Sequence, residues 1–84
     1  YNPTSGTFSF TFRLSQASDT QIYIYDITGN VMQIISTSGT FGYNVVDWNG
    51  QTGFGGSIPE GAYVYQIISG GKPIPGGRGK FPVI

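Results

Sequence analysis

Hydrophobic and polar residues alternate with a period of two near the start of the chain. Within Thr7–Leu14, the positions of Phe8, Phe10, Phe12 and Leu14 alternate with polar residues. Because successive side chains of a β-strand point to opposite faces, this pattern predicts a strand with one face in the core and the other in water. We therefore expect the phenylalanines of this strand to be core residues.

The next predicted strand, Gln21–Ile27, is bulky on both faces. Ile22 and Ile24 share one face, whereas Tyr23 and Tyr25 share the other. This pattern indicates a central strand, or one whose tyrosine rings lie flat with their hydroxyls in water.

Four more predicted strands follow, and turn residues separate them. They are Val31–Ser36, Tyr43–Trp48, Ala62–Ser69 and Lys80–Ile84. Fourteen glycines and five prolines leave no room for a helix of normal length. Six short strands in 84 residues predict a single all-β domain, residues 1–84, built as a sandwich or a small barrel.

Three tight turns are predicted from residues that favour them. They are Thr28-Gly29-Asn30, Asn49-Gly50 and Pro59-Glu60-Gly61. Gly29 and Asn30 are expected to close a hairpin that needs positive φ, and Asp26 to brace it by accepting bonds from backbone N–H groups ahead of it. Trp48 is expected to plug the end of the sandwich beside Gly50. Pro59 and Gly61 are expected to set the turn that starts the strand of Tyr63.

The end of the chain predicts an edge strand on a flexible tether. Gly70–Gly79 is rich in glycine and proline, so we expect it to be mobile. Pro82 cannot donate to a ladder, which places the last strand at a sheet edge. We expect this strand to detach without unfolding the core and to add to a partner's sheet, with Phe81 and Val83 giving selectivity. The candidate partner strand is Lys80, Phe81, Pro82, Val83 and Ile84.

Composition excludes several classes of function. Four acidic and four basic residues give no net charge, so we expect no binding to nucleic acid and no attraction to anionic lipid. No segment approaches the length of apolar residues that a membrane span needs, which predicts no direct insertion. Without histidine or cysteine, the usual general base, the thiol nucleophile and most transition-metal ligands are missing.

The four carboxylates give little support for catalysis. Asp19, Asp26, Asp47 and Glu60 each stand beside a predicted turn, where capping explains them. We therefore expect a non-catalytic protein without cofactor or metal. A calcium site that uses Asp26 or Asp47 with loop carbonyls is a weaker alternative, because there is no dense acidic loop.

The aromatic residues raise the alternative of a carbohydrate-binding module. Such modules stack sugar rings on exposed faces of Trp and Tyr, and this chain has one tryptophan and six tyrosines. A lone tryptophan at a strand end of a small sandwich more often fills the core. We therefore expect Trp48 to be buried, and rank glycan binding below the other functions.

Several sequence segments, taken in their order along the chain, resemble those of one family, the C-terminal sorting domains of the type IX secretion system. Similar segments occur in the immunoglobulin-like domain of flagellar hook-capping proteins. The resemblance spans nearly the whole chain. The segments that carry it are Asn2-Pro3, the strand Phe8–Leu14, Ile22–Val31, Val46-Asp47-Trp48-Asn49-Gly50, Ile58–Tyr65 and Gly79-Lys80-Phe81.

This resemblance implies an immunoglobulin-like β-sandwich that acts as the sorting signal of an exported protein. Family members lie at the C-terminus of proteins exported by Bacteroidetes-like bacteria. They are recognised in the periplasm and commonly removed by a sortase during attachment to the cell surface. The implied partners are secretion machinery or sortase proteins, together with neighbouring domains of the same polypeptide. Tyr1-Asn2-Pro3 reads as a cut inside such a longer chain.

A second reading is a structural immunoglobulin-like accessory module of a surface or secreted enzyme, including the sortase itself. The last strand has no basic residue after Lys80, where sorting domains usually end with Lys or Arg. A retained structural copy of the domain would fit this ending.

Overall fold

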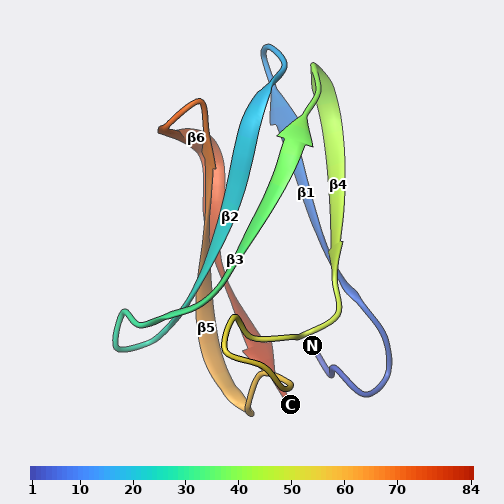
Figure 1. Ribbon diagram of the computed structural model, residues 1–84, viewed down its shortest axis with the longest axis vertical. Coiled ribbons are helices and arrows are strands. Elements are labelled where there is room, and N and C mark those ends of the chain that lie inside the picture. The colour runs from blue at the N-terminus through green and yellow to red at the C-terminus, as the bar shows by residue number, and fades with distance from the viewer.

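The computed structural model describes residues 1–84 as six strands in two sheets (Figure 1). Strands β1 and β4 form a two-stranded sheet, and the second sheet has the order β3-β2-β5-β6. Every neighbouring pair is antiparallel. The strands are β1 (Phe8–Leu14), β2 (Ser18–Asp26), β3 (Val31–Gly39), β4 (Gly42–Trp48), β5 (Gly61–Ser69) and β6 (Lys72–Val83).

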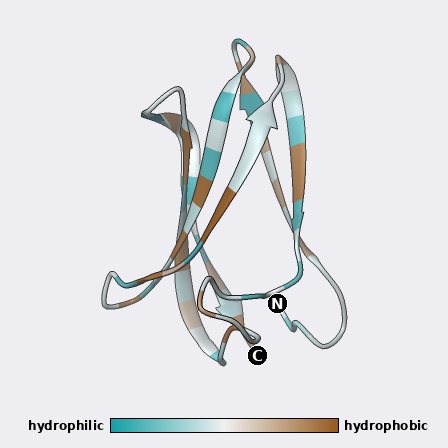
Figure 2. Ribbon diagram, viewed as in Figure 1, coloured by the Kyte–Doolittle hydropathy of each residue, from teal (hydrophilic) through white to brown (hydrophobic).

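The two sheets face each other across one hydrophobic core, so the predicted all-β sandwich is confirmed. Hydrophobic and hydrophilic residues alternate along the strands (Figure 2). From β1, Phe10 and Phe12 point into the core, and from β2, Ile22 and Ile24 are fully buried. Phe8 is partly buried and packs against the same cluster. The period-two pattern therefore identified the inward faces correctly.

Strand β2 is a central strand, as its two bulky faces predicted. It pairs with β3 on one side and with β5 on the other. Tyr23 and Tyr25 lie on its outer face and remain partly exposed. No helix of the structure is long and apolar enough to cross a membrane.

The prediction that Gly70–Gly79 is a mobile tether is wrong. Ser69 pairs with Lys72, so β5 and β6 form a hairpin with Gly70 and Gly71 as its two loop residues. Their φ angles are 59° and 79°, which suits the type I′ turn that matches the twist of two antiparallel strands. Strand β6 then extends from Lys72 to Val83.

A bulge divides β6 into two paired parts. Pro73 pairs with Ile68 and Arg78 with Gln66, so residues 74–77 stand opposite a single residue of β5. Gly76 has a φ of 70° within this bulge. The prolines and glycines of the segment therefore shape an irregular strand, since bulges tolerate residues that a regular ladder excludes.

Gly79 lies beneath an aromatic ring of the neighbouring strand. It pairs with Tyr65, and a Cβ added at Gly79 would lie 2.7 Å from the Tyr65 ring. The absence of a side chain thus allows the Tyr65 ring to lie against the β6 backbone.

Candidate functional site

The outer edge of β6 is the exposed edge that the sequence predicted. Strand β6 is the last strand of the four-stranded sheet. The carbonyl of Pro82 points away from β5, because it accepts a hydrogen bond from the Tyr1 amino group at 2.8 Å. Within a strand, alternate residues direct their backbone groups to the same side. The backbone groups of Arg78 and Lys80 therefore also point toward the open edge.

The start of the chain covers one end of this edge. The Ile84 N–H donates to the carbonyl of Tyr1 at 2.8 Å, next to the bond between Tyr1 and Pro82. These two bonds hold Tyr1 beside the end of β6, and both termini lie at the same end of the sandwich (Figure 1). The stretch around Arg78 and Lys80 is the part of the edge beyond this cover.

The prediction that Phe81 and Val83 are presented to a partner is wrong for the folded domain. Phe81 and Val83 are 4% and 2% exposed and belong to the core. The outward side chains of this stretch are instead Arg78, Lys80 and Pro82. Phe81 and Val83 are therefore unavailable to a partner while the domain is folded.

Phe81 lies at the centre of an aromatic cluster that joins the two sheets. Its ring centroid is 4.8 Å from that of Phe8 and 6.1 Å from that of Trp48 on the two-stranded sheet. On its own sheet it stacks against Tyr63 at 6.0 Å. Removal of this strand would thus open the core.

The outer face of the four-stranded sheet carries two neighbouring rows of side chains, which we call the outer rows. Each row crosses all four strands from β3 to β6. The first row is Ile34, Tyr23, Gln66 and Arg78, and the second is Val31, Tyr25, Val64 and Lys80. Each row is apolar at β3, aromatic at β2 and cationic at β6, and neither contains an acid.

The loop after β2 is braced by Asp26, as predicted. Its Oδ1 accepts hydrogen bonds from the Thr28 N–H, the Thr28 hydroxyl and the Asn30 N–H, at 2.7–2.9 Å. Its Oδ2 accepts from the Asn30 side-chain amide. The Thr28 hydroxyl bond, followed by the backbone N–H of Asn30, lowers the pKa of Asp26 to about 2. Gly29 has a φ of 92°, but Asn30 does not have positive φ, which corrects the prediction for that residue.

Trp48 ends β4, and Gly50 lies in the turn that follows it. Trp48 is 4% exposed, so its predicted burial is confirmed, and its indole N–H donates to the Gln51 carbonyl at 2.9 Å. Gly50 has a φ of 84°, and an added Cβ would lie 2.9 Å from Pro3. Trp48 therefore offers no platform to a ligand.

Tyr63 anchors the turn that precedes β5. Its hydroxyl donates to the Pro59 carbonyl at 2.7 Å, a bond of the kind found at tyrosine corners of immunoglobulin-like sandwiches. Burial, followed by the charge of Asp26, raises the pKa of this hydroxyl. Gly61 begins β5 without positive φ, so the turn rests on Pro59 and Tyr63 more than on Gly61.

The acidic residues lie apart. No three of them come close enough to form a metal-binding group. Besides Asp26 in its loop, Asp47 accepts a hydrogen bond from the Ser9 hydroxyl at 2.6 Å. A hollow of about 340 Å³ lies on the outer face, between the Asp26 loop and the outer rows, lined by Tyr25, Asp26, Gln66 and Arg78 among others.

The fold is similar to domains of two solved proteins. The dimeric latent PorU from Porphyromonas gingivalis matches all of this chain with a TM-score of 0.75 and 22% identity. FlgD from P. aeruginosa matches 94% of the chain with a TM-score of 0.67 and 25% identity. The chain spans 9% of that PorU chain and 61% of that FlgD chain.

These matches confirm the predicted relation at the level of the fold. They come from the two groups that the sequence resembles, type IX secretion proteins and hook-capping proteins. The domain is an immunoglobulin-like sandwich. No family model matches the sequence, and no curated protein matches it.

Sequence reasoning missed the outer rows and the cover that Tyr1 gives to β6. The rows depend on register between strands, which no single strand's pattern contains. The Gly70-Gly71 pair was a usable signal, because two adjacent glycines between strand-like runs favour a two-residue hairpin. That hairpin fixes the pairing of Lys72 and Pro73 with β5, and the bulge then shifts the register so that Arg78 and Lys80 lie beside Gln66 and Val64.

Proposed function

We propose that this domain is a non-catalytic sorting or anchoring domain of the type IX route, which acts by protein–protein recognition. It would direct an exported protein through the periplasm to the cell surface. The observation that carries the proposal is the fold match to PorU, a type IX secretion sortase, over the entire chain. The sequence segments that resemble those of sorting domains, in the same order along the chain, support it independently.

The open edge of β6 is the part of the domain best suited to a partner. Arg78 and Lys80 direct their backbone groups outward, and a strand of the secretion machinery could pair with them. Recognition then takes place with β6 in place, because Phe81 and Val83 are buried in the core. The partner recognises the folded domain, and β6 does not have to be released from the core.

Proline substitution at Lys80 tests this mechanism. The Lys80→Pro variant loses one outward N–H but no bond to β5, since Lys80 faces the open edge as Pro82 does. A reporter fused ahead of Tyr1 is expected to reach the surface of a type IX-competent bacterium. The Lys80→Pro fusion is expected to remain in the periplasm, whereas the matched Lys80→Gln fusion, which keeps the N–H, is exported.

Each result of this experiment has a distinct meaning. If the unchanged fusion is never exported by a competent host, the sorting proposal is overturned. If it is exported and the Lys80→Pro fusion is exported equally well, sorting stands but the edge of β6 is not its recognition site. Trp48 emission checks that both variants are folded.

The second candidate function is a structural accessory module that stabilises or spaces neighbouring domains. The observation that favours it is the fold match to FlgD, a hook-capping protein, over 94% of this chain. A module of this kind would leave export of the fusion unchanged when it is removed, but would lower the stability of the domain next to it.

A further inference from the structure

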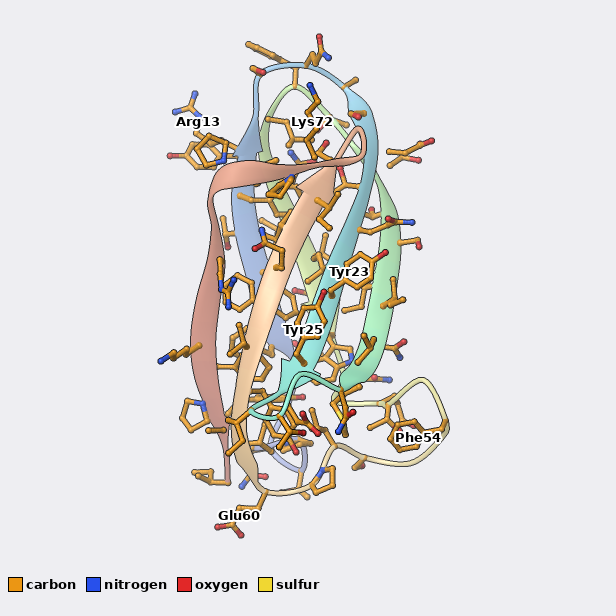
Figure 3. All side chains as sticks on the ribbon, turned by 90° about the vertical axis from the view of Figure 1, so that its left-hand side faces the viewer. Arg13, Tyr23, Tyr25, Phe54, Glu60 and Lys72 are labelled. Atoms are coloured by element: carbon orange, nitrogen blue, oxygen red, sulfur yellow. The ribbon has the colours of Figure 1, made fainter.

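The two tyrosines of the outer rows form a stacked aromatic pair. The rings of Tyr23 and Tyr25 are 6.1 Å apart between centroids, with an angle of 14° between their planes. Figure 3 shows both side chains along β2, on the outer face of the four-stranded sheet. An aromatic face is electron-rich, so it attracts the weakly positive C–H groups on one side of a pyranose ring. The exposed face of this stacked pair can therefore hold a sugar ring.

The cations of the outer rows have no acidic partner across the sheet. Arg78 stands opposite Gln66, and Lys80 stands opposite Val64. The nearest carboxylate along the tyrosine strand is Asp26, and both of its oxygens are occupied by bonds within its own loop. Arg78 and Lys80 are thus available to an external anion, and a guanidinium group can bind a carboxylate through two bonds.

The spacing of these groups sets the size of the ligand. The cations on β6 lie two strands from the tyrosines on β2, which is about 10 Å because neighbouring strands lie about 4.8 Å apart. The hollow of about 340 Å³ lies between Tyr25 and Arg78, and its lining also includes Asp26. A ligand that reaches both must be longer than one sugar ring.

We propose that the outer rows bind an acidic oligosaccharide, with a sugar ring stacked on the exposed face of the Tyr23–Tyr25 pair and a carboxylate held by Arg78 and Lys80. An acidic peptide fits this face less well. Extended peptides gain affinity from backbone bonds at a strand edge, but a peptide paired with the open edge of β6 would lie a further strand away from Tyr23 and Tyr25. Across the face itself, the backbone groups of β2 and β5 are already paired with neighbouring strands. This inference does not depend on the sorting role.

Direct titration of the 84-residue chain tests the proposal. The probes are an oligogalacturonate, an uncharged maltooligosaccharide and poly-L-glutamate, followed by calorimetry or by the NMR signals of the tyrosine rings. The oligogalacturonate is expected to bind at low salt and to weaken as salt screens the cations. The other two probes are expected to bind at least about tenfold more weakly, because each lacks one of the two interactions.

Two pairs of substitutions assign the effect to the outer rows. Arg78→Gln with Lys80→Gln, and separately Tyr23→Ala with Tyr25→Ala, are each expected to weaken oligogalacturonate binding by about tenfold or more. The cation pair is exposed and leaves the core untouched, so it remains informative if the tyrosine pair unfolds the domain.

The matched controls are Tyr43→Ala and Lys72→Gln. Tyr43 is exposed on the other sheet, and Arg13 already covers its ring at 4.7 Å. Both controls are expected to bind as the unchanged chain does. The proposal is overturned if the oligogalacturonate does not bind, if the controls lose as much affinity as the outer-row variants, or if poly-L-glutamate binds equally well. In that last case an acidic polypeptide is the ligand.

Discussion

Phe81 connects the two sheets through its aromatic ring. Its ring contacts both sheets, through Phe8 and Phe10 on β1 and through Tyr63 and Tyr65 on β5. If this ring is removed, neither sheet can fill the empty space by moving alone, because the ring packs against both. Its loss leaves a cavity in a core of 11 buried residues.

The Phe81→Ala variant is expected to lose about 3–5 kcal/mol of unfolding free energy, through lost burial and the cavity left behind. Chemical denaturation followed by Trp48 emission measures this loss. The matched control is Phe54→Ala, because Phe54 is 75% exposed, and it should change stability by less than about 0.5 kcal/mol. Equal effects of the two substitutions would show that Phe81 is not part of the core.

The Asp26 loop gives a second prediction, in the acid range. The folded state lowers the pKa of Asp26 to about 2 from its ordinary value of 3.8. The stability it contributes is therefore fully present above pH 3.8 and disappears as the pH falls through about 2. The stability difference between the chain and its Asp26→Asn variant is expected to shrink across this window.

Urea denaturation at a series of pH values measures that difference. Glu60→Gln is the control, since Glu60 is exposed and accepts none of the hydrogen bonds that lower the Asp26 pKa. A difference between Asp26→Asn and the unchanged chain that stays constant from pH 5 to pH 2 would contradict the role of the ionised carboxylate.

At the level of single residues, the sequence predicted burial well and contacts poorly. The inward positions of Phe10, Phe12 and Trp48 followed from alternation and from the habits of tryptophan in small sandwiches. Phe81 was expected to serve a partner, because its strand was read as an isolated segment. Whether an apolar side chain faces the protein's own core or a partner depends on the strands beside it, and alternation does not identify those.

The hairpin of β5 and β6 is the element whose prediction failed, and the reason is physical. Glycine and proline are frequent both in mobile segments and in irregular strands. In Gly70–Gly79 they form a type I′ turn, a bulge and a site for the Tyr65 ring. Each glycine has a specific geometrical role, so the composition alone could not separate order from disorder.

Substitution of Gly71 tests whether this hairpin is fixed. Gly71 has a φ of 79°, and an added Cβ would contact nothing within 4 Å, so Gly71→Ala changes only the backbone energy. The expected loss of unfolding free energy is about 1 kcal/mol, with a smaller loss for Gly71→Asn because asparagine tolerates this conformation better. Thermal denaturation of the variants measures both.

The control is Gly53→Ala, at a glycine where no positive φ is required and the nearest atom would be 3.5 Å away. It is expected to have little effect on stability. If Gly71→Ala is as neutral as Gly53→Ala, the turn is mobile as the sequence first indicated, and the hairpin does not fix the pairing of Lys72 and Pro73 with β5.

At the scale of the whole molecule, the two sheets depend on β6 for their connection through the core. The sheet of β1 and β4 has no hydrogen-bonded neighbour, so it is held to the other sheet by side-chain packing. Phe81 and Val83 both belong to that packing. The last strand is thus part of the folding unit, even though it lies at an edge.

Deletion of Lys80–Ile84 is therefore expected to unfold the domain rather than leave a stable remainder. It removes two core side chains, and a phenylalanine alone accounts for about 3–5 kcal/mol in a small domain whose total stability is on the order of 5–15 kcal/mol.

Deletion of Ile84 alone is the matched control. Ile84 is 72% exposed, and its deletion removes the hydrogen bond from its N–H to the carbonyl of Tyr1. The shorter deletion should keep a buried Trp48 with blue-shifted emission and a cooperative unfolding transition, whereas the longer one should show solvent-exposed emission and no transition. If the domain without Lys80–Ile84 still unfolds cooperatively, then β6 can leave the core intact, and release of the strand becomes the mechanism by which a partner would bind it.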